Sequence, residues 1–562
     1  MKRNCLRTCA FATVIAVMAV ACGDSKSSSS TGGASTTGGS ATTAASPATT
    51  TAPVKGGTLT IGTYAEAPGV DPIMTSGAGT TYGMEVAAVY DRLIQWDPVG
   101  KKYIPRLAQS YSANADFTEW TLKIRPGVKF ADGTAYDADA VKFNFDRQKA
   151  SNAILKGPLT NMKDVSVVDP LTVKVTLTDS WPGFVGVLAN SLGMIASPTA
   201  VKAGGAGFAT NPVNAGAGPF QFSSLKPKEA LSLKRNPTYW DGEVYLDELK
   251  FVFIAGAQAT YDALKTGTID VAFLREAAVV DQAKKAGLDG VSTVETLGEM
   301  ILVNAGVEVT CTGGKPEPLC TGQPDNAKVA TKTPGSNKTV RQAVQLAIDL
   351  PTIDQRANAG TGIPASSIYD TSFPWNPNVM EPKQDVEQAK KLVQQAKAAG
   401  WDGKIRLSCN NTPARQGTAL SIQAMLTAVG MDVDMSRANQ DVNQVIGDVI
   451  TNKNFDLACW GLATPPDDWA FVQLDSIFRS TSGSNRTGYK SAAMDAALDE
   501  EKKASNDAAK TAAYKKIADL IVADAVTVPI AHAEERLTWS AKVHGPIATS
   551  FTTADFSKTF KK

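Results

Sequence analysis

Histidine is nearly absent from the sequence: only His532 and His544 occur among 562 residues. Because imidazole is a common ligand of zinc and nickel in proteins, two histidines exclude a histidine-rich metal site. His532 begins only HAEER, so the zinc-protease pattern HExxH is absent as well. We therefore expect neither a metal site nor a cofactor.

A large excess of charge of either sign is also lacking. The formal net charge is +1, whereas a nucleic-acid-binding domain needs a basic face, so we expect no nucleic-acid partner. Hydrophobic residues make up 43% and charged residues 20% of the chain, which is typical of a folded protein and not of a disordered one. The length exceeds that of one ordinary core and predicts two or three domains.

Catalytic patterns are missing too. The chain has no GxSxG pattern and no phosphate-binding Walker loop. SSLK at Ser223–Lys226 and KTG at Lys265–Gly267 have the residues of two motifs of penicillin-recognising hydrolases but not the predicted secondary structure that those motifs require. SSLK follows a strand-like run and opens no helix, and KTG falls where a helix ends, with Gly267 as its C-cap. We expect that the protein is not an enzyme.

The N-terminus has the composition of a targeting segment. Residues 1–21 join a basic start, MKRNCLR, to an apolar run that is too short to span a membrane. AVAC at Ala19–Cys22 resembles the lipobox of bacterial lipoproteins, which implies cleavage before Cys22 and diacylation of its thiol. An ordinary cleaved signal followed by an incidental cysteine is the alternative.

Residues 22–54 are mostly Ser, Thr, Gly and Ala. A segment of this composition cannot bury enough apolar surface to fold, so we expect a flexible tether between a lipid anchor and a folded domain. No later apolar run approaches membrane-spanning length. These features predict an extracytoplasmic protein that is held at the cell membrane by its lipid.

Four cysteines remain once the signal segment and Cys22 are set aside, namely Cys311, Cys320, Cys409 and Cys459. An even number in an oxidising compartment favours disulfides. Cys311 and Cys320 bracket TGGKPEPL, a turn-rich loop that a disulfide could close, whereas a zinc site usually shows CxxC spacing. Cys409 and Cys459 lie near the ends of two predicted strands, and we expect them to pair as well.

The region from Lys404 to Gly461 alternates strands with helices. KIRLSC, MDVDMS and FDLACWG have the pattern of strands, and residues 417–429 and 441–451 have the pattern of helices. This alternation predicts an α/β fold with a parallel sheet and right-handed crossovers. Ligands bind beyond the carboxyl ends of such strands, which points to the loops Asn410–Arg415 and Leu462–Ala470. Plain solvated connections are the alternative for both loops.

Two further helices carry recognisable end signals. Thr339–Asp349 has apolar residues at helical spacing, and we expect a capping box of Thr339 with Gln342 and an end at Pro351. Asp385–Ala399 is also predicted to be a helix, with Asp385 as its N-cap and Gly400 just past its end.

Seven segments in a fixed order carry a family resemblance. The segment from Ile104 to Arg147 resembles the signature of the family 5 extracellular solute-binding proteins, which are the peptide- and nickel-type binding proteins of ATP-binding-cassette (ABC) importers. Its turns at Pro126-Gly127 and Asp132-Gly133 and its cap at Asp137 are expected to be structural. The other six segments are Gly216–Phe222, Leu233–Trp240, Tyr261–Phe273, Thr339–Asp349, FDLACWG at Phe455–Gly461 and NRTGY at Asn485–Tyr489.

The resemblance implies an α/β, two-lobed clamp of the periplasmic-binding-protein type (type II) that closes on a ligand. The domain would span residues 55–545. Lobe I would comprise about 55–308 and 525–562 with an inserted subdomain at about 91–215, and lobe II would comprise about 309–524. One crossing between the lobes is expected near Ile301–Gly306.

The function implied is capture of short peptides, or of another small polar solute, for a membrane permease driven by a separate ATPase subunit. With so few histidines a directly ligated nickel ion is not expected, although a chelated metal stays open. A monomer is expected. The alternative is a surface peptide sensor or chaperone-like lipoprotein that is not coupled to import.

The family's peptide-binding members clamp the ligand's amino group with an aspartate after the FDLACWG-type strand. Asp468 is the positional match, with Asp467 beside it. A carboxylate is needed at this place, because an ammonium group that is buried between closing lobes loses its hydration and must meet an opposite charge. Arg415, on the neighbouring loop, is the candidate for a ligand carboxylate. The remaining candidate ligand-binding residues, which would form walls and a bordering loop, are Trp460, Trp469, Asn485 and Tyr489.

Overall fold

The computed structural model of the chain describes residues 52–63, 65–74, 82–98, 100–151, 159–462, 464–545 and 554–562. The expected signal segment, Cys22 and nearly all of the expected tether lie outside these residues. Within the described residues, no helix is both long enough and apolar enough to cross a membrane.

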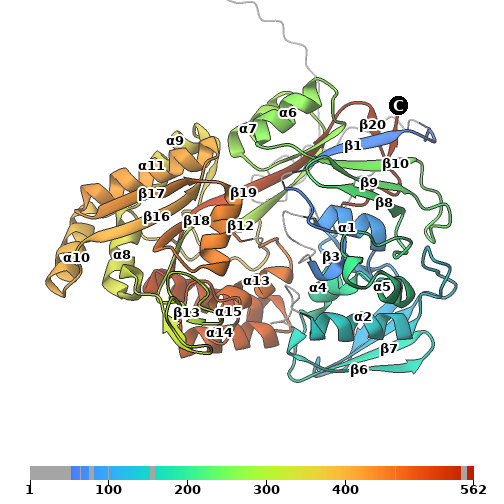
Figure 1. The fold of residues 1–562 in the computed structure, drawn as a ribbon, viewed down its shortest axis with the longest axis horizontal. Coiled ribbons are helices and arrows are strands. Elements are labelled where there is room, and N and C mark those ends of the chain that lie inside the picture. Colours follow the sequence, from blue (N-terminus) through green and yellow to red (C-terminus); the bar gives the residue numbers. More distant parts are fainter. Residues whose placement is uncertain are drawn as a thin grey trace, which may run out of the picture. The chain divides into compact units, whose positions relative to one another are not determined.

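One large mixed sheet runs through the described domain (Figure 1). Its strands follow the order β17-β16-β18-β12-β19-β11-β1-β10-β9-β8, and β15 pairs with β19 in addition. Strands β16, β17 and β18 pair in parallel, as the strand–helix alternation predicts. The bounds in this order are Asp432–Gln440, Lys404–Asn410, Leu457–Trp460, Gly290–Val303, Thr527–Trp539, Val271–Leu274, Thr58–Thr63, Glu248–Phe253, Ala230–Arg235 and Phe220–Lys226, with Ile363–Pro364 for β15.

Strands β12 and β19 connect the two halves of this sheet. Strand β19 pairs with β11 on one side and with β12 on the other. The first residues of β12 pair only with β19 among the described strands, whereas Met300–Val303 of β12 lie next to β18 on their second side. The β12–β19 ladder is irregular between Glu295 and Glu299, where three residues of β12 face one of β19. β12 therefore passes from one half to the other at residues 295–299, upstream of the expected Ile301–Gly306. We call this irregular stretch the crossing.

A separate four-stranded antiparallel sheet, of order β4-β5-β7-β6, lies within the segment expected to form an inserted subdomain. Helices α2 and α4 accompany it, and the chain returns to the main sheet at β8. Asp137 caps α2, with its side chain accepting a hydrogen bond from the Ala140 amide at 2.9 Å. The bounds are Ala108–Ala113 (β4), Glu119–Ile124 (β5), Met162–Asp169 (β6), Thr172–Leu177 (β7), Ala138–Ala150 (α2) and Phe184–Leu188 (α4).

Other helices and short strand pairs surround the two sheets (Figure 1). Helices are α1 (Gly83–Tyr90), α5 (Pro198–Gly204), α6 (Ala257–Lys265), α7 (Ala277–Lys285), α8 (Lys338–Ala347), α9 (Leu350–Asn358), α10 (Val386–Ala398), α11 (Pro413–Ala428), α12 (Val442–Ile446), α13 (Trp469–Phe478), α14 (Ala492–Lys503) and α15 (Asp507–Asp524). Short strand pairs are β2 (Ile94–Asp97) with β3 (Lys102–Pro105), β13 (Glu308–Thr310) with β14 (Lys328–Ala330), and β20 (Val543–His544) with β21 (Phe560–Lys561).

Two expected helix ends differ from the structure. The capping box at Thr339 is wrong, because α8 begins at Lys338 and the side chain of Asn337 accepts the bond from the Thr339 amide. Pro351 does not end that helix but stands in the first turn of α9, where its missing N–H leaves no bond unmade. Asp385 caps α10 through the Gln388 amide at 2.9 Å, as expected.

Two disulfides join the four described cysteines. Cys311 and Cys320 have Cα atoms 5.4 Å apart and close the loop between β13 and β14. Cys409 and Cys459, with Cα atoms 4.9 Å apart, follow the paired residues Ser408 and Ala458 of β16 and β18. The second disulfide therefore joins neighbouring parallel strands within a buried core.

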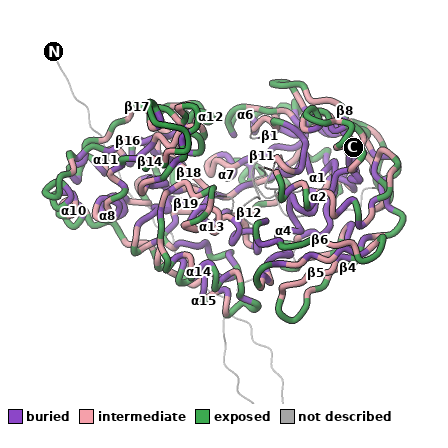
Figure 2. Tube along the Cα trace, turned by 60° about the horizontal axis from the view of Figure 1, so that its bottom comes forward, coloured by how far each residue is buried: buried purple, intermediate pink, exposed green. Residues whose placement is uncertain are grey.

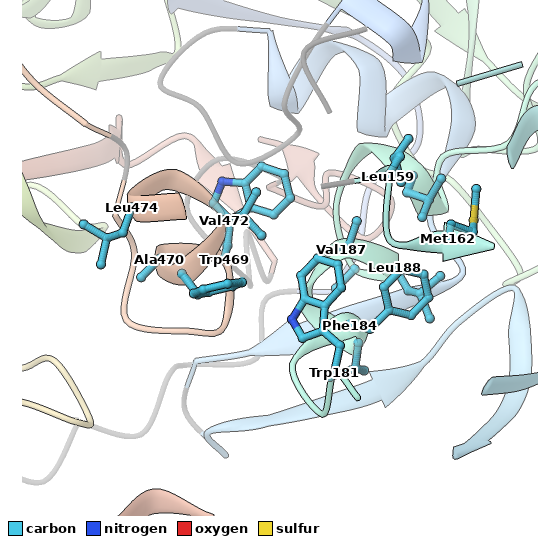
Figure 3. Close-up of a cluster of buried hydrophobic side chains, with 14 of the residues drawn as sticks. Leu159, Met162, Trp181, Phe184, Val187, Leu188, Trp469, Ala470, Val472 and Leu474 are labelled. Atoms are coloured by element: carbon cyan, nitrogen blue, oxygen red, sulfur yellow. The ribbon is translucent and has the colours of Figure 1, made fainter. Parts of the chain in front are cut away.

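Buried residues concentrate along the central strands, and exposed residues lie on outer helices and loops (Figure 2). One buried hydrophobic cluster is shared by the subdomain and by α13 (Figure 3). Trp181 and Phe184 belong to the subdomain side, and Trp469 and Phe471 belong to α13; the Trp181 and Phe471 rings meet edge-on at 5.9 Å. Segments nearly 300 residues apart in the sequence thus form one core.

Candidate ligand-binding site

The segment 464–468, which follows β18, is anchored on the irregular stretch of β12. The fully buried Thr464 accepts a hydrogen bond from the Leu297 amide through its hydroxyl at 3.0 Å and from the Thr296 amide through its carbonyl at 3.3 Å. Asp467 then accepts from the Trp469 amide at 2.8 Å, which opens α13. These bonds fix two consecutive aspartates beside the crossing.

Asp467 is almost completely buried. Burial raises the pKa of its carboxyl group to about 7, and the neighbouring Asp468 adds to the rise while Lys510 and the Trp469 amide oppose it. A carboxyl group with such a pKa changes charge near neutrality, and any cation brought close would favour its ionised form.

Asp468 already has a cationic partner within the protein. Its carboxylate pairs with the ammonium group of Lys510, and both side chains are about one-tenth exposed. The ammonium group also lies 4.1 Å from the ring centroid of Trp375. On its other side, the Asp468 amide donates to the Tyr103 hydroxyl at 3.2 Å. Asp468 therefore joins α15 to the subdomain instead of standing free to receive an amino group.

Two glycines of the subdomain allow this close approach. A Cβ atom at Gly183 would lie 3.0 Å from a carboxylate oxygen of Asp468, and one at Gly186 would lie 2.9 Å from the Asp468 Cβ atom. The Gly186 position would also be 3.0 Å from the Tyr103 hydroxyl. The absence of these side chains lets α4 pack directly against Asp468.

Two glutamates face each other across the crossing strands. Glu295 of β12 pairs with Ala533, and Glu535 of β19 pairs with Thr293, so the glutamates are diagonal neighbours on one face of the sheet. They are 1% and 0% exposed, and none of their carboxylate oxygens makes a hydrogen bond of normal geometry among the described residues, although the Thr464 amide stabilises the charge of Glu295 and Arg275 that of Glu535. Burial raises the pKa of both groups, and the charge of Glu535 and then Asp467 raises that of Glu295 further.

In the part of the chain that the structure describes, one cation opposes this pair directly. Arg275 follows β11, and its Nε atom lies 3.6 Å from Glu535 Oε1. Its charge lowers the pKa of both glutamates but does not offset the effect of burial, and the Thr464 amide opposes the rise only at Glu295. The face of the crossing is therefore rich in uncompensated carboxyl groups.

Arg415 extends this group of charges. It stands in the first turn of α11 and not on a loop, since that helix begins at Pro413. Its Nη2 atom lies 3.4 Å from Glu299 Oε1, and its buried Nη1 atom has no hydrogen-bond partner among the described residues. Burial, together with the charge of Glu299, raises the pKa of Glu276, while Arg415 and Arg275 oppose the rise.

We name these residues the crossing cluster. It contains six carboxyl groups and three cationic groups, so carboxyl groups outnumber cations two to one. Its members are Glu276, Glu295, Glu299, Asp467, Asp468 and Glu535 with Arg275, Arg415 and Lys510.

The two candidate tryptophans have different surroundings. Trp469 is fully buried in the cluster shared with the subdomain, so its role there is packing (Figure 3). Trp460 is half-buried at the end of β18, and the Arg486 guanidinium lies 5.3 Å from its ring centroid. Burial lowers the pKa of Arg486 to about 10.

Asn485 and Tyr489 have hydrogen bonds inside their own loop and to α15. The Asn485 side chain accepts from Thr487 and Gly488 and donates to the Tyr489 carbonyl at 2.8 Å. The Tyr489 hydroxyl bonds to Asp524, at the end of α15. The structure does not connect either residue to the crossing cluster through these bonds.

Sequence reasoning missed six members of the crossing cluster, namely Glu276, Glu295, Glu299, Glu535, Arg275 and Lys510. The signal was present for Glu295 and Glu535, because GVSTVETLGEMILV and TVPIAHAEERLTW carry charges inside otherwise apolar strands. Charges that a buried strand retains have to be compensated by other residues or by a bound molecule. Their proximity followed only from the β12–β19 register.

Comparison with known proteins defines the class. Residues 102–485 match the family described as bacterial extracellular solute-binding proteins, family 5. The glutathione-binding protein GsiB of Shigella dysenteriae is 26% identical over 438 residues, covering 75% of this chain and 79% of that protein.

Solved structures share the fold. The binding protein DppA of Helicobacter pylori, in complex with the peptide STSA, superposes with a TM-score of 0.74 at 22% identity, covering 90% of this chain and 98% of that one. NikZ of Campylobacter jejuni, in complex with Ni(L-His), gives 0.72 at 20% identity, covering 90% and 99%.

The fold is thus the two-lobed binding-protein fold, as the sequence motifs imply. The chain belongs to the family 5 bacterial extracellular solute-binding proteins.

Proposed function

We propose that this protein is the substrate-binding component of an ABC importer, and that it captures short peptides between its lobes for a permease with a separate ATPase. The observation that carries this proposal is the match over residues 102–485 to a solute-binding family. A glutathione-binding relative and a structural neighbour in complex with the peptide STSA support a peptide ligand.

In this proposal, lobe I comprises residues 55–308 and 525–562 and includes the subdomain at 91–215. Lobe II comprises residues 309–524, and the two lobes are joined at the crossing. The ligand would lie against the crossing cluster, beside Asp467, Asp468 and Arg415. Trp460 with Arg486 would border it. The protein would act as a monomer, anchored outside the cytoplasm by a lipid on Cys22.

Titration calorimetry against defined pools of di- to hexapeptides tests the ligand class. We expect saturable binding of at least one peptide pool. Sugars and opine-type conjugates serve as comparison ligands, since one solved neighbour is described in complex with agropinic acid. Binding of a sugar or an opine without any peptide binding would refute the peptide proposal while leaving a solute-binding role.

A further inference from the structure

We infer that the ligand of this protein carries a cationic nitrogen group, an ammonium or a guanidinium, which binds at Glu295, Glu535 and Asp467. This inference deepens the proposed function and rests on it, because it assumes that the solute binds at the crossing. It assigns the cation to a different place from Asp468.

The first step concerns Asp468 itself. Its carboxylate is paired with Lys510, and Lys510 is held in turn against Trp375. A ligand ammonium would have to displace a buried lysine to reach Asp468, and the displaced lysine would lose its partner. A cation of the ligand is therefore better received elsewhere.

The second step concerns the glutamates. Glu295 and Glu535 are at least nine-tenths buried, occupy one face of the crossing and make no hydrogen bond of normal geometry through any carboxylate oxygen among the described residues. Buried polar groups in native proteins are nearly always hydrogen-bonded, so each exception needs an explanation. A cation with several N–H donors would supply the missing bonds to Glu295 and Glu535. Asp467, which already accepts from the Trp469 amide, would add its negative charge.

The third step concerns the charges that face this position. Arg275 opposes Glu535 at 3.6 Å, Asp467 approaches from the 464–468 segment, and Lys510 is already committed to Asp468. One arginine cannot neutralise three carboxylates. A metal ion is not the better occupant, since no three acidic, histidine or cysteine side chains among the described residues converge closely enough to hold one. The N–H donors of an ammonium or guanidinium group point in different directions and can reach carboxyl groups that do not converge on one point.

The test uses the full-length protein and four probe peptides: Ala-Lys-Ala, acetyl-Ala-Lys-Ala, Ala-Gln-Ala and acetyl-Ala-Gln-Ala. Acetylation removes the terminal ammonium group and the change of Lys to Gln removes the side-chain ammonium group, so the four peptides distinguish binding of one from binding of the other. We expect at least one cationic probe to bind about 30-fold or more tightly than acetyl-Ala-Gln-Ala, because a buried charge pair that loses one partner weakens binding by that order. The double variant Glu295→Gln/Glu535→Gln should abolish this preference, and the exposed control Glu387→Gln should retain it.

Calorimetry in buffers of different ionisation enthalpy gives a second readout. A cation favours the ionised carboxyl groups, so binding of acetyl-Ala-Lys-Ala near pH 7 should release protons, and its affinity should rise from pH 6 to pH 8. The double variant should release fewer protons. The lysine side chain of this probe stays charged over that range.

Failure of the two proposals can be told apart with agmatine and putrescine as additional probes. If no peptide binds but agmatine does, and the double variant loses it, the peptide proposal falls while the cation site stands. Equal affinity for neutral and cationic peptides, an unchanged preference in the double variant, or no binding of any cationic probe would each overturn the inference.

Discussion

At the scale of single residues, the pair of Asp468 and Lys510 is the most consequential contact. Each side chain is about one-tenth exposed, so removal of either partner leaves a buried charge. We expect Asp468→Asn or Lys510→Met alone to lower the free energy of unfolding by about 3–5 kcal/mol, and the double variant to recover part of this loss. Urea unfolding without added ligand measures it.

The exposed pair Lys515–Asp519 provides the matched control, since its side chains are 57% and 50% exposed. Its removal should cost less than about 1 kcal/mol. Single variants of Asp468 and Lys510 that unfold like the control would contradict a buried, mutually dependent pair.

Glu501 gives a prediction for pH dependence. Burial raises its pKa from 4.5 to about 8, although the charge of Lys510 opposes the rise. At a pH between these two pKa values, the Glu501 carboxyl group is ionised in the unfolded chain and protonated in the folded protein. The free energy of unfolding therefore falls progressively as the pH rises towards 8. Glu501→Gln removes the effect.

We therefore expect Glu501→Gln to raise the melting temperature more at pH 8 than at pH 5, with the difference levelling off above pH 8. Thermal unfolding across this range measures it. Glu500→Gln, on the exposed pair with Lys516, should show a pH-independent difference. A constant difference for Glu501→Gln as well would mean that its carboxyl group is not buried in solution.

At the scale of elements, the two disulfides close loops of very different length. Cys409–Cys459 spans 50 residues and joins two buried strands, whereas Cys311–Cys320 spans 9 residues in a peripheral hairpin. The loop-entropy relation predicts losses of about 4 kcal/mol for Cys409→Ala/Cys459→Ala and about 3 kcal/mol for Cys311→Ala/Cys320→Ala. Urea unfolding of both double variants compares them, and a larger loss for the peripheral pair would argue against the entropic explanation.

Local sequence signals explain which elements could be predicted. The parallel order of β16–β18 followed from strand–helix alternation, and Asp137 and Asp385 cap their helices as their spacing indicated. Asn337 was overlooked as a cap, because it stands one residue before the helix while Thr339 offered a more familiar motif.

The crossing cluster could be predicted only in part, because some of its members are brought together by pairing between strands that are distant in the sequence. Asp467 and Asp468 were found from their position after β18. Glu295 and Glu535 come together only through a register between strands that lie far apart in the sequence, interrupted by an irregularity that no local pattern reveals.

At the scale of the whole molecule, α4 of the subdomain packs against Asp468 because Gly186 has no side chain. We expect Gly186→Leu to separate these surfaces and to weaken ligand binding. Hydrogen exchange should increase both around Tyr103 and in residues 464–470. Gly207→Leu, where an added Cβ meets nothing within 4 Å, is the control. Unchanged protection in Gly186→Leu would show that the contact is not maintained in solution.

The proposed lipid anchor concerns the molecule in its cell. Cys22→Ala should release the protein from membranes into the surrounding medium, because acylation of that thiol would be the anchor. Fractionation of cells followed by immunoblotting measures the distribution. A variant that stays with the membrane fraction would exclude Cys22 as the point of attachment.

Among the described strands, β19 is the one that pairs with both β12 and β11. It comprises Thr527–Trp539. A variant that lacks β19 would leave β12 and β11 each with an unpaired edge, and such an edge is a template for aggregation. The two halves of its sheet would then be connected by the polypeptide alone and not by strand pairing, so their open edges would expose the variant to proteases.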